Sequence, residues 1–233
     1  MFYFDPMYIL CVLLPTLIIT GAAQAWISSA YRKWGNTANS RRITGQQTAE
    51  VLFRAGHVQP VRLEVAPGQL TDHYDPSQGV VRLSQGVAMQ PTVAAMAVTA
   101  HELGHVQQHQ QSSVLMGLRT MLIPGARFGP SIGIILIILG LMMRFTGLAW
   151  LGLLIFAGAT LFTVITLPVE LDASRRAMNM LEQSGLLASP QDAQGARSVL
   201  TAAAFTYIAA VATSLLTLLY YAMLIMGSSR DRD

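Results

Sequence analysis

The sequence predicts a membrane α-helical protein with about four transmembrane helices and a small α+β domain inserted between the first and second of them. Of its 233 residues, 52% are apolar and only 12% are charged, whereas soluble domains average about a quarter charged. This composition also excludes disorder, which needs low hydrophobicity and high charge. The apolar residues gather in four stretches near the ~20 residues that a span requires, namely Met7–Ile27, Phe128–Met143, Leu148–Val169 and Ala202–Met226.

The first stretch is interpreted as an uncleaved anchor. Ala23-Gln24-Ala25 resembles a signal-peptide cleavage site, but no Lys or Arg precedes the stretch, Asp5 does, and Arg32 and Lys33 follow it. This charge pattern is typical of an anchor whose N-terminus lies outside. The second and third stretches are predicted to form a tight transmembrane hairpin. A pair of core helices in a soluble domain is the alternative, but too little polar sequence remains to cover them.

Basic residues predict the orientation of the connections. Residues 28–127 hold nine Lys and Arg and residues 170–200 hold three, whereas Arg144 stands alone at the hairpin tip. The positive-inside rule then places both long connections in the cytoplasm. The tail, with Arg230 and Arg232, would lie outside, against the rule.

The polar connection is predicted to form the α+β domain. A short helix is expected over Thr44–Ala55, with Gly56 as its stop, and two strands over Val61–Val65 and Gly79–Ser84. We expect a two- or three-stranded antiparallel sheet, followed by a helix from about Pro91 to Gln110. The predicted parts are the anchor, the domain, the hairpin, a cytosolic helix, and the last span with its tail, over residues 1–27, 28–127, 128–169, 170–201 and 202–233.

A metal-binding motif stands on the last helix of this domain. His101-Glu102-Leu103-Gly104-His105 is a complete HExxH sequence. Residues four apart lie on one helical face, about 6 Å apart along the axis, so both imidazoles reach one Zn²⁺ ion. Glu102 reaches a metal-bound water instead of the metal. The alternative is two ordinary surface histidines.

A catalytic zinc site also needs a third protein ligand and an open position for water. His109 continues the series, but a rise of ~12 Å from His101 along the helix excludes it. Glu170, after Pro168 and on the same predicted side, is the better candidate. We expect a new helix to begin there, with Asp172 near its N-terminus. The alternative is that Glu170 and Asp172 only cap that helix.

Three blocks in this order resemble a known family: Asp72-His73-Tyr74-Asp75-Pro76, Ala100 to His105, and Leu167 to Ala177. They are similar to the YugP-like family of neutral zinc metallopeptidases of bacterial membranes. The resemblance implies a membrane-bound zinc endopeptidase of the bacterial inner membrane with a zincin-like domain, and it favours Glu170 as third ligand. The more distant heat-shock-type membrane peptidases carry a Glu-x-x-x-Asp motif, and Ser174 stands where that Asp would be. The partner of one zinc-binding histidine is thus left unassigned.

These parts predict a gluzincin-like hydrolysis of peptide bonds. One Zn²⁺ ion, held by His101, His105 and Glu170, would activate water and polarise the scissile carbonyl, and Glu102 would act as general base and acid. His73, Tyr74 and Arg175 are the candidates for stabilising the oxyanion. For His73 and Tyr74, the alternative is a turn that only shapes the loop.

The substrate is expected to be a protein or peptide associated with the lipid bilayer. Glu170 follows the third span within about a turn, so its metal would lie near the bilayer surface. The strand at Gly79–Ser84 is expected to offer an edge to an extended substrate. A formal charge of +3 is too weak to indicate a nucleic-acid partner, and no feature assigns an oligomeric state.

Two other functions compete with this interpretation. An intramembrane metalloprotease would need the motif inside a span, but Gln90 and Gln107 leave only ~10 apolar residues around it, far short of a span. A zinc-binding membrane scaffold or chaperone without proteolytic turnover is compatible with the same ligands. The presence of Glu102 favours catalysis, because a purely structural zinc site needs no general base.

Overall fold

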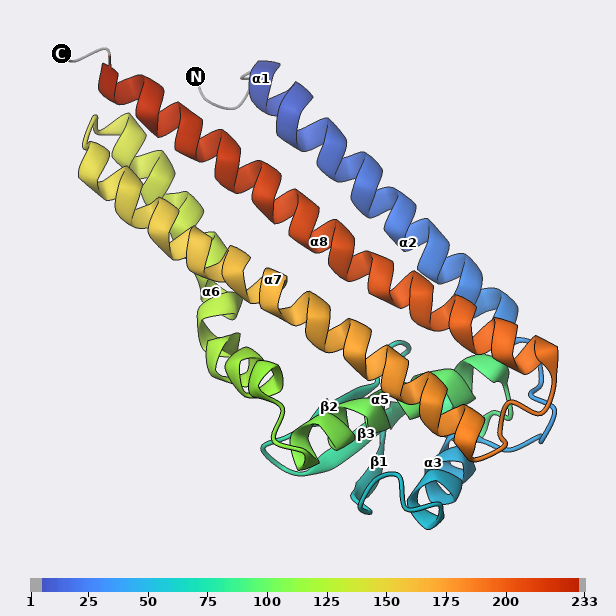
Figure 1. The fold of residues 1–233 in the computed structure, drawn as a ribbon. Helices are drawn as coiled ribbons and strands as arrows, with labels where there is room; N and C mark the ends of the chain where they lie inside the picture. The colour runs from blue at the N-terminus through green and yellow to red at the C-terminus, as the bar shows by residue number, and fades with distance from the viewer. Residues whose placement is uncertain (1–5, 231–233) are drawn as a thin grey trace. The chain divides into compact units, whose positions relative to one another are not determined.

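The computed structural model describes residues 6–230, which are mostly helical (Figure 1). Asp5 and Arg232, used above for orientation, lie outside the described residues. The N-terminal segments are α1 (Pro6–Tyr8), a short π-helical stretch (Ile9–Leu13) and α2 (Leu14–Gly35). The others are α3 (Gly45–Arg54), β1 (Arg62–Ala66), β2 (His73–Asp75), β3 (Val80–Ser84), α4 (Gln85–Met89), α5 (Val93–Gln110), α6 (Val114–Met142), α7 (Thr146–Gln183) and α8 (Pro190–Arg230).

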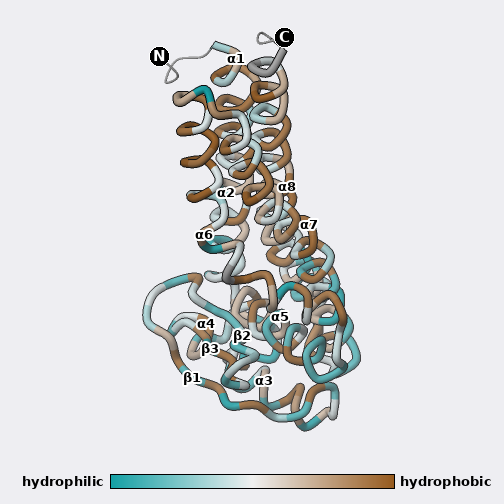
Figure 2. The backbone as a smooth tube through the Cα atoms, turned by 90° about the vertical axis from the view of Figure 1, so that its left-hand side faces the viewer, coloured by the Kyte–Doolittle hydropathy of each residue, from teal (hydrophilic) through white to brown (hydrophobic). Residues whose placement is uncertain are grey.

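The expected number of membrane-length helices is confirmed within the described residues. Four helical segments are long and apolar enough to cross a membrane: Pro6–Gly35, Gly125–Met142, Thr146–Gln183 and Pro190–Gly227. Apolar colour runs along these helices in Figure 2, whereas hydrophilic colour is frequent around the strands and α3.

The chain divides into two compact units. One comprises Met1–Ala23, Leu118–Pro168 and Thr206–Asp233; the other comprises Gln24–Gly117 and Val169–Phe205. The second unit contains the sheet, α3, α4 and α5, with the end of α7 and the start of α8. Its core joins Leu52, Leu83, Met96, Leu103 and Leu181, all almost completely buried.

In the first unit, α6 and α7 form the expected tight hairpin. Only residues 143–145 separate the two helices. A Cβ atom on Gly140 would lie 2.4 Å from the backbone nitrogen of Ala149, and one on Gly152 would lie 2.6 Å from the carbonyl oxygen of Gly133. Small residues of this kind allow the backbones of membrane helices to approach closely. The helix α6 also begins at Val114, well before the expected start at Phe128.

The expected helix start at Glu170 is wrong, because α7 continues through Pro168 to Gln183. Proline removes one helical hydrogen bond and costs about 3 kcal/mol in a helix interior. Beyond Pro168, however, α7 buries one face in the second unit: Val169, Ala173, Ala177 and Leu181 are each at most 1% exposed. Their four-residue spacing requires an unbroken helix, and the burial of this face offsets the lost hydrogen bond. Asp172 therefore lies inside a helix and not at its N-terminus.

The sheet has three strands in the order β1-β3-β2. The strand β2 pairs antiparallel with β3, but β1 pairs parallel with β3, from Arg62 opposite Val80 to Ala66 opposite Ser84. The expectation of an antiparallel sheet is therefore wrong for this pair. The chain reverses twice between β1 and β3, first in the loop after β1 and then after β2, so β3 runs in the direction of β1.

This topology also corrects the substrate edge. The strand β3 is central and has both edges paired, so it offers none, contrary to expectation. The segment at His73–Asp75, for which a turn was the alternative, is an edge strand. Its neighbour in the second unit is the motif helix α5 (Figure 1).

The helix α3 begins where the sequence indicates, whereas α5 begins at Val93, with Pro91 outside the helix and not at its first position as expected. A capping box at α3 joins the Thr44 hydroxyl to the Gln47 backbone N–H and the Gln47 side chain to the Thr44 N–H, and Gly56 follows with a positive φ of 74°. The Thr92 hydroxyl accepts a hydrogen bond from the Ala95 N–H and caps α5.

The motif glycine sets how closely α5 approaches α7. A Cβ atom on Gly104 would lie 2.5 Å from the carbonyl oxygen of Ala173, which is backbone and not a side chain that can turn away. The two helices therefore cross in close contact at Gly104 and Ala173. The crossing therefore places the predicted metal ligands on two helices that face each other.

We expect Gly104→Ala to destabilise the protein by about 1–3 kcal/mol, because overpacking forces the two backbones apart. The measurement is the thermal unfolding midpoint of purified protein, which falls by about 2–4 °C per kcal/mol at this chain length. Gly117→Ala is the matched control, since a Cβ at this helical position meets nothing within 4 Å. An equal effect of both substitutions would contradict the close crossing.

Candidate metal centre

The helix α5 presents the two motif histidines from inside the second unit. The helix is surrounded by its unit along most of its length, and Ala94, Ala97 and Ala100 are at most 1% exposed. His105 and Glu102 are also buried, while His101 is partly buried. Small residues on α5 thus admit close neighbours, and the motif side chains are among the few polar groups of a largely apolar interior.

The structure brings Glu170 to both histidines. Its Oε2 atom lies 3.2 Å from Nε2 of His101 and 3.5 Å from Nε2 of His105, and the three ligand atoms all lie within 4.8 Å of one another. Ligands about 2.1 Å from a tetrahedral Zn²⁺ ion are separated by about 3.4 Å. The two imidazoles and one carboxylate therefore fit zinc in both chemistry and spacing.

A buried amide orients His105. The Gln108 Nε2 group donates to the carbonyl oxygen of Val169 at 2.9 Å and to Oδ2 of Asp172 at 2.8 Å. Both partners only accept, so the amide nitrogen faces them and Oε1 faces Nδ1 of His105 at 3.0 Å. His105 must then carry its proton on Nδ1, which leaves the Nε2 lone pair directed toward Glu170 and available to a metal.

Asp172 is the anionic end of the hydrogen-bonded series His105–Gln108–Asp172, which we call the relay. Its Oδ2 also accepts from Nε of Arg176 at 2.6 Å, and Arg176 in turn donates to Gln107 and Gln111. Asp172 is therefore an outer partner of the metal site and does not cap a helix.

Ser174 occupies the position left unassigned by the sequence. Its hydroxyl lies 3.2 Å from Nδ1 of His101, one helical turn after Glu170. A serine thus makes the contact for which the heat-shock-type motif would supply an aspartate.

Sequence reasoning missed Gln108, although a signal was present. Positions 101, 105 and 108 share one face of a helix. His109, by contrast, is exposed and outside the cluster of ligand atoms, as expected.

Glu102 is buried beside the ligand cluster. Burial raises its pKa to about 7. His101 lowers the pKa, the nearby carboxylates of Glu170 and Asp72 raise it, and a hydrogen bond from the Tyr74 backbone N–H lowers it. Glu102 therefore exchanges a proton near neutral pH, as a general acid and base requires.

The three other predicted site residues lie in different places. Tyr74 is nearest, through its backbone contact with Glu102, and its hydroxyl is hydrogen-bonded to Nδ1 of His109 at 2.6 Å. His73 is exposed, and its Nδ1–H donates to the carbonyl oxygen of Thr71 at 2.8 Å. Arg175 is 72% exposed and 3.9 Å from Asp172; five residues after Glu170, it lies on another face of α7.

Comparison with known proteins identifies the family. The profile of a family described as "Putative neutral zinc metallopeptidase" matches residues 8–226. A relative from Bacillus subtilis (strain 168), named "Putative membrane protease YugP", is 36% identical over 211 residues, which cover 91% of this chain and 93% of the relative. No solved structure matches the chain. The chain belongs to this family of zinc metallopeptidases, which confirms the resemblance seen in its three sequence blocks.

We expect Gln108→Met to weaken zinc binding about 10- to 100-fold, as is typical when the outer partner of a metal-binding histidine is lost. Methionine retains the buried volume, but its sulfur accepts the Nδ1–H of His105 only weakly and cannot donate to Asp172. Competition with a chromophoric chelator measures the affinity. Gln110→Met is the control, because within residues 6–230 the Gln110 side chain is hydrogen-bonded only to the backbone of Gln59. Unchanged affinity in Gln108→Met would contradict the relay.

We also expect Glu102 to make the metal-free protein less stable as the pH rises. Its pKa is about 7 when folded, against an ordinary 4.5, so between these values only the folded state keeps the proton. The resulting stabilisation is complete below about pH 4.5 and is lost as the pH rises through 7, a change of about 3 kcal/mol.

Unfolding midpoints of chelator-treated native protein and Glu102→Gln, measured across pH 4.5–7.5, isolate this contribution. The unfolding midpoint of Glu102→Gln should rise relative to that of the native protein as the pH increases. Parallel curves would show that the Glu102 pKa is not raised.

Proposed function

We propose that this member of the neutral zinc metallopeptidase family is a membrane-embedded endopeptidase of the gluzincin type, with His101, His105 and Glu170 as ligands of one Zn²⁺ ion. One observation carries the proposal: Nε2 atoms of two histidines converge on a buried carboxylate oxygen at 3.2 and 3.5 Å. A buried general base, Glu102, stands beside them on the same helix.

Each group at the site has a separate role in the proposed reaction. Bound zinc would supply a Lewis acid for the scissile carbonyl and for the attacking water. Glu102 takes the proton of that water and passes it to the leaving amine. Burial, which raises the pKa of Glu102 in the metal-free protein, favours the protonated form between the two transfers. Gln108 and Ser174 hold the two imidazoles in the orientation that directs Nε2 inward.

Tyr74 is the preferred candidate for stabilising the oxyanion. Its backbone N–H is hydrogen-bonded to Glu102, so Tyr74 is the nearest of the three to the general base, although its hydroxyl must first leave Nδ1 of His109, 2.6 Å away. His73 requires a rotation away from Thr71, and Arg175 is turned to another face of α7. A hydrogen-bond donor at this position stabilises charge that develops in the transition state.

The outer edge of β2 suits an extended substrate. This strand is at the border of the sheet and its Tyr74 N–H faces Glu102. A peptide that adds to this edge gains main-chain hydrogen bonds beside the general base. The sequence requirement at the scissile bond would then be weak.

We place the enzyme in the bacterial inner membrane with its site on the cytoplasmic side. The support is the excess of Lys and Arg in the two long connections. In chain order, the sheet and α5 follow α2 and precede α6, as in a domain inserted between the first two spans. Glu170 lies on α7, a helix that also contains an apolar stretch long enough to cross a membrane. This location favours membrane-associated protein or peptide substrates.

Glu102→Gln should retain one bound zinc and lose about 10²- to 10⁴-fold in turnover, because the amide cannot accept the proton of the attacking water. Zinc content by elemental analysis and cleavage of soluble and membrane-tethered casein measure the two effects.

Glu50→Gln is the matched control, since Glu50 is exposed on α3 and pairs only with Arg54 among the described residues. Unimpaired cleavage by Glu102→Gln would refute the mechanism. A native protein that binds zinc but cleaves no substrate would favour the scaffold or chaperone.

A further inference from the structure

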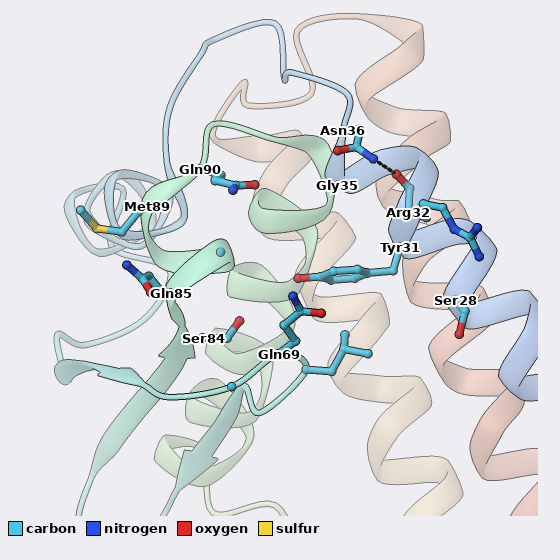
Figure 3. Close-up of a pocket in the computed structure, with 13 residues that line it drawn as sticks. Ser28, Tyr31, Arg32, Gly35, Asn36, Gln69, Ser84, Gln85, Met89 and Gln90 are labelled. Carbon is cyan, nitrogen blue, oxygen red and sulfur yellow. Dashed lines mark hydrogen bonds between the residues drawn. The ribbon is translucent and has the colours of Figure 1, made fainter.

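A cavity lies in the same compact unit as the metal centre and is lined by none of the metal ligands. It has a volume of about 680 Å³, within the range of ligand-binding pockets. The end of the anchor helix α2, the loop between β1 and β2, and α4 form its walls (Figure 3). We call it the anchor pocket. No part of the mechanism above uses it.

The anchor pocket begins a short distance from the general base along β2. Tyr74 contacts Glu102 through its backbone N–H. Two residues earlier, the Asp72 carboxylate accepts hydrogen bonds from the backbone N–H of Ser84 at 2.7 Å and from its hydroxyl at 3.0 Å. Ser84 lines the pocket. Two residues of extended chain span about 7 Å, so a peptide on the β2 edge reaches the pocket within two or three residues.

The lining of the pocket suits a peptide main chain. Arg32 is the one charged residue among the 13 that line it, and its side chain extends from α2 away from Tyr31. Carboxamides come from all three walls, at Asn36, Gln69 and Gln85. A carboxamide both donates and accepts, which matches the alternating N–H and C=O groups of an extended chain.

Two further features support a ligand-binding role for the pocket. Tyr31 extends from α2 across the cavity, with its hydroxyl directed toward the side where Ser84 lies (Figure 3). Leu70, on the loop wall, has a φ of 56°, in the left-handed region that a bulky side chain rarely adopts. Strained residues of this kind concentrate at ligand-binding segments.

We infer that the anchor pocket binds the substrate polypeptide on the C-terminal side of the cleaved bond, about two to five residues beyond it. The direction follows from β2, which runs from His73 toward Asp75. Antiparallel pairing is the more stable arrangement, and a substrate paired in that sense runs toward Asp72 and the pocket. The anchor helix then contributes a wall of the substrate site as well as a span. This inference rests on the proposed peptidase function.

Gly86 offers a direct test, because a Cβ at this lining position meets nothing within 4 Å. Gly86→Trp should therefore fill the cavity without disturbing the fold. Gly117→Trp, at an equally open helical position outside the pocket, is the matched control. Zinc content and the unfolding midpoint verify that each variant is intact. Gln85→Ala is a second variant that removes only hydrogen bonds.

The substrates are synthetic peptides built around a bond mapped in casein with the native protein. One series extends from two to six residues beyond the cleaved bond; the control series extends by the same number on the N-terminal side. In the native protein and Gly117→Trp, kcat/KM should rise at least tenfold along the first series. Gly86→Trp should abolish this rise and leave the shortest peptide within about twofold, and Gln85→Ala should reduce it.

A flat first series in the native protein, or a rise that survives in Gly86→Trp, would overturn the anchor pocket as a substrate site. So would a Gly86-dependent rise along the N-terminal series. If Gly86→Trp alters activation by anionic lipid vesicles but not the length dependence, the occupant is a lipid headgroup and the inference is wrong. Glu102-dependent cleavage of the shortest peptide would still support the proposed function in each case. Absence of any Glu102-dependent cleavage would refute both.

Discussion

The close crossing of α5 and α7 at Gly104 and Ala173 is the constraint on which the rest of the site depends. A Cβ atom at Gly104 would lie 2.5 Å from a backbone oxygen, so only glycine allows this approach. Ala173 lies between Glu170 and Ser174 on α7, while Gly104 lies between His101 and His105 on α5. Bringing the two small residues together therefore sets two imidazoles against one carboxylate and one hydroxyl. The glycine inside the motif is a packing requirement of the metal centre.

A site of this kind places several polar groups in an apolar interior, and the structure satisfies them in layers. Glu170 is 2% exposed and faces both histidines, which would be costly for an unpartnered carboxylate. Behind His105, Gln108 is hydrogen-bonded to both His105 and Asp172, and Arg176 balances the charge of Asp172. An apolar side chain at Gln108 would leave Val169, Asp172 and His105 each short of one partner. The relay thus orients His105 and also satisfies the hydrogen bonds of buried polar groups, so the residues behind the ligands are constrained as well as the ligands.

Local signals predicted the parts of this arrangement that depend on spacing within one element. Hydropathy gave the four membrane-length helices, the HExxH spacing gave His101, Glu102 and His105, and the block around Pro168 pointed to Glu170. The sequence could not show that α7 passes through Pro168, because burial of Ala173 and Ala177 against other elements outweighs the proline. Nor could it show that β1 runs parallel to β3, which depends on two chain reversals. Gln108 and Ser174 acquire their roles only when α5 and α7 cross, although their positions follow the helical period.

The distribution of acidic residues links the metal centre to the membrane. Within the described residues 6–230, all Asp and Glu side chains belong to the unit that holds the site, from Glu50 to Asp192. The other unit has none in its described part, although it includes Arg119, Arg127 and Arg144. A carboxylate in lipid is expensive, whereas long basic side chains can extend to the interface. The low charge content therefore has two causes: one unit excludes carboxylates because its surroundings are apolar, and the other uses several of those that remain to build the metal centre.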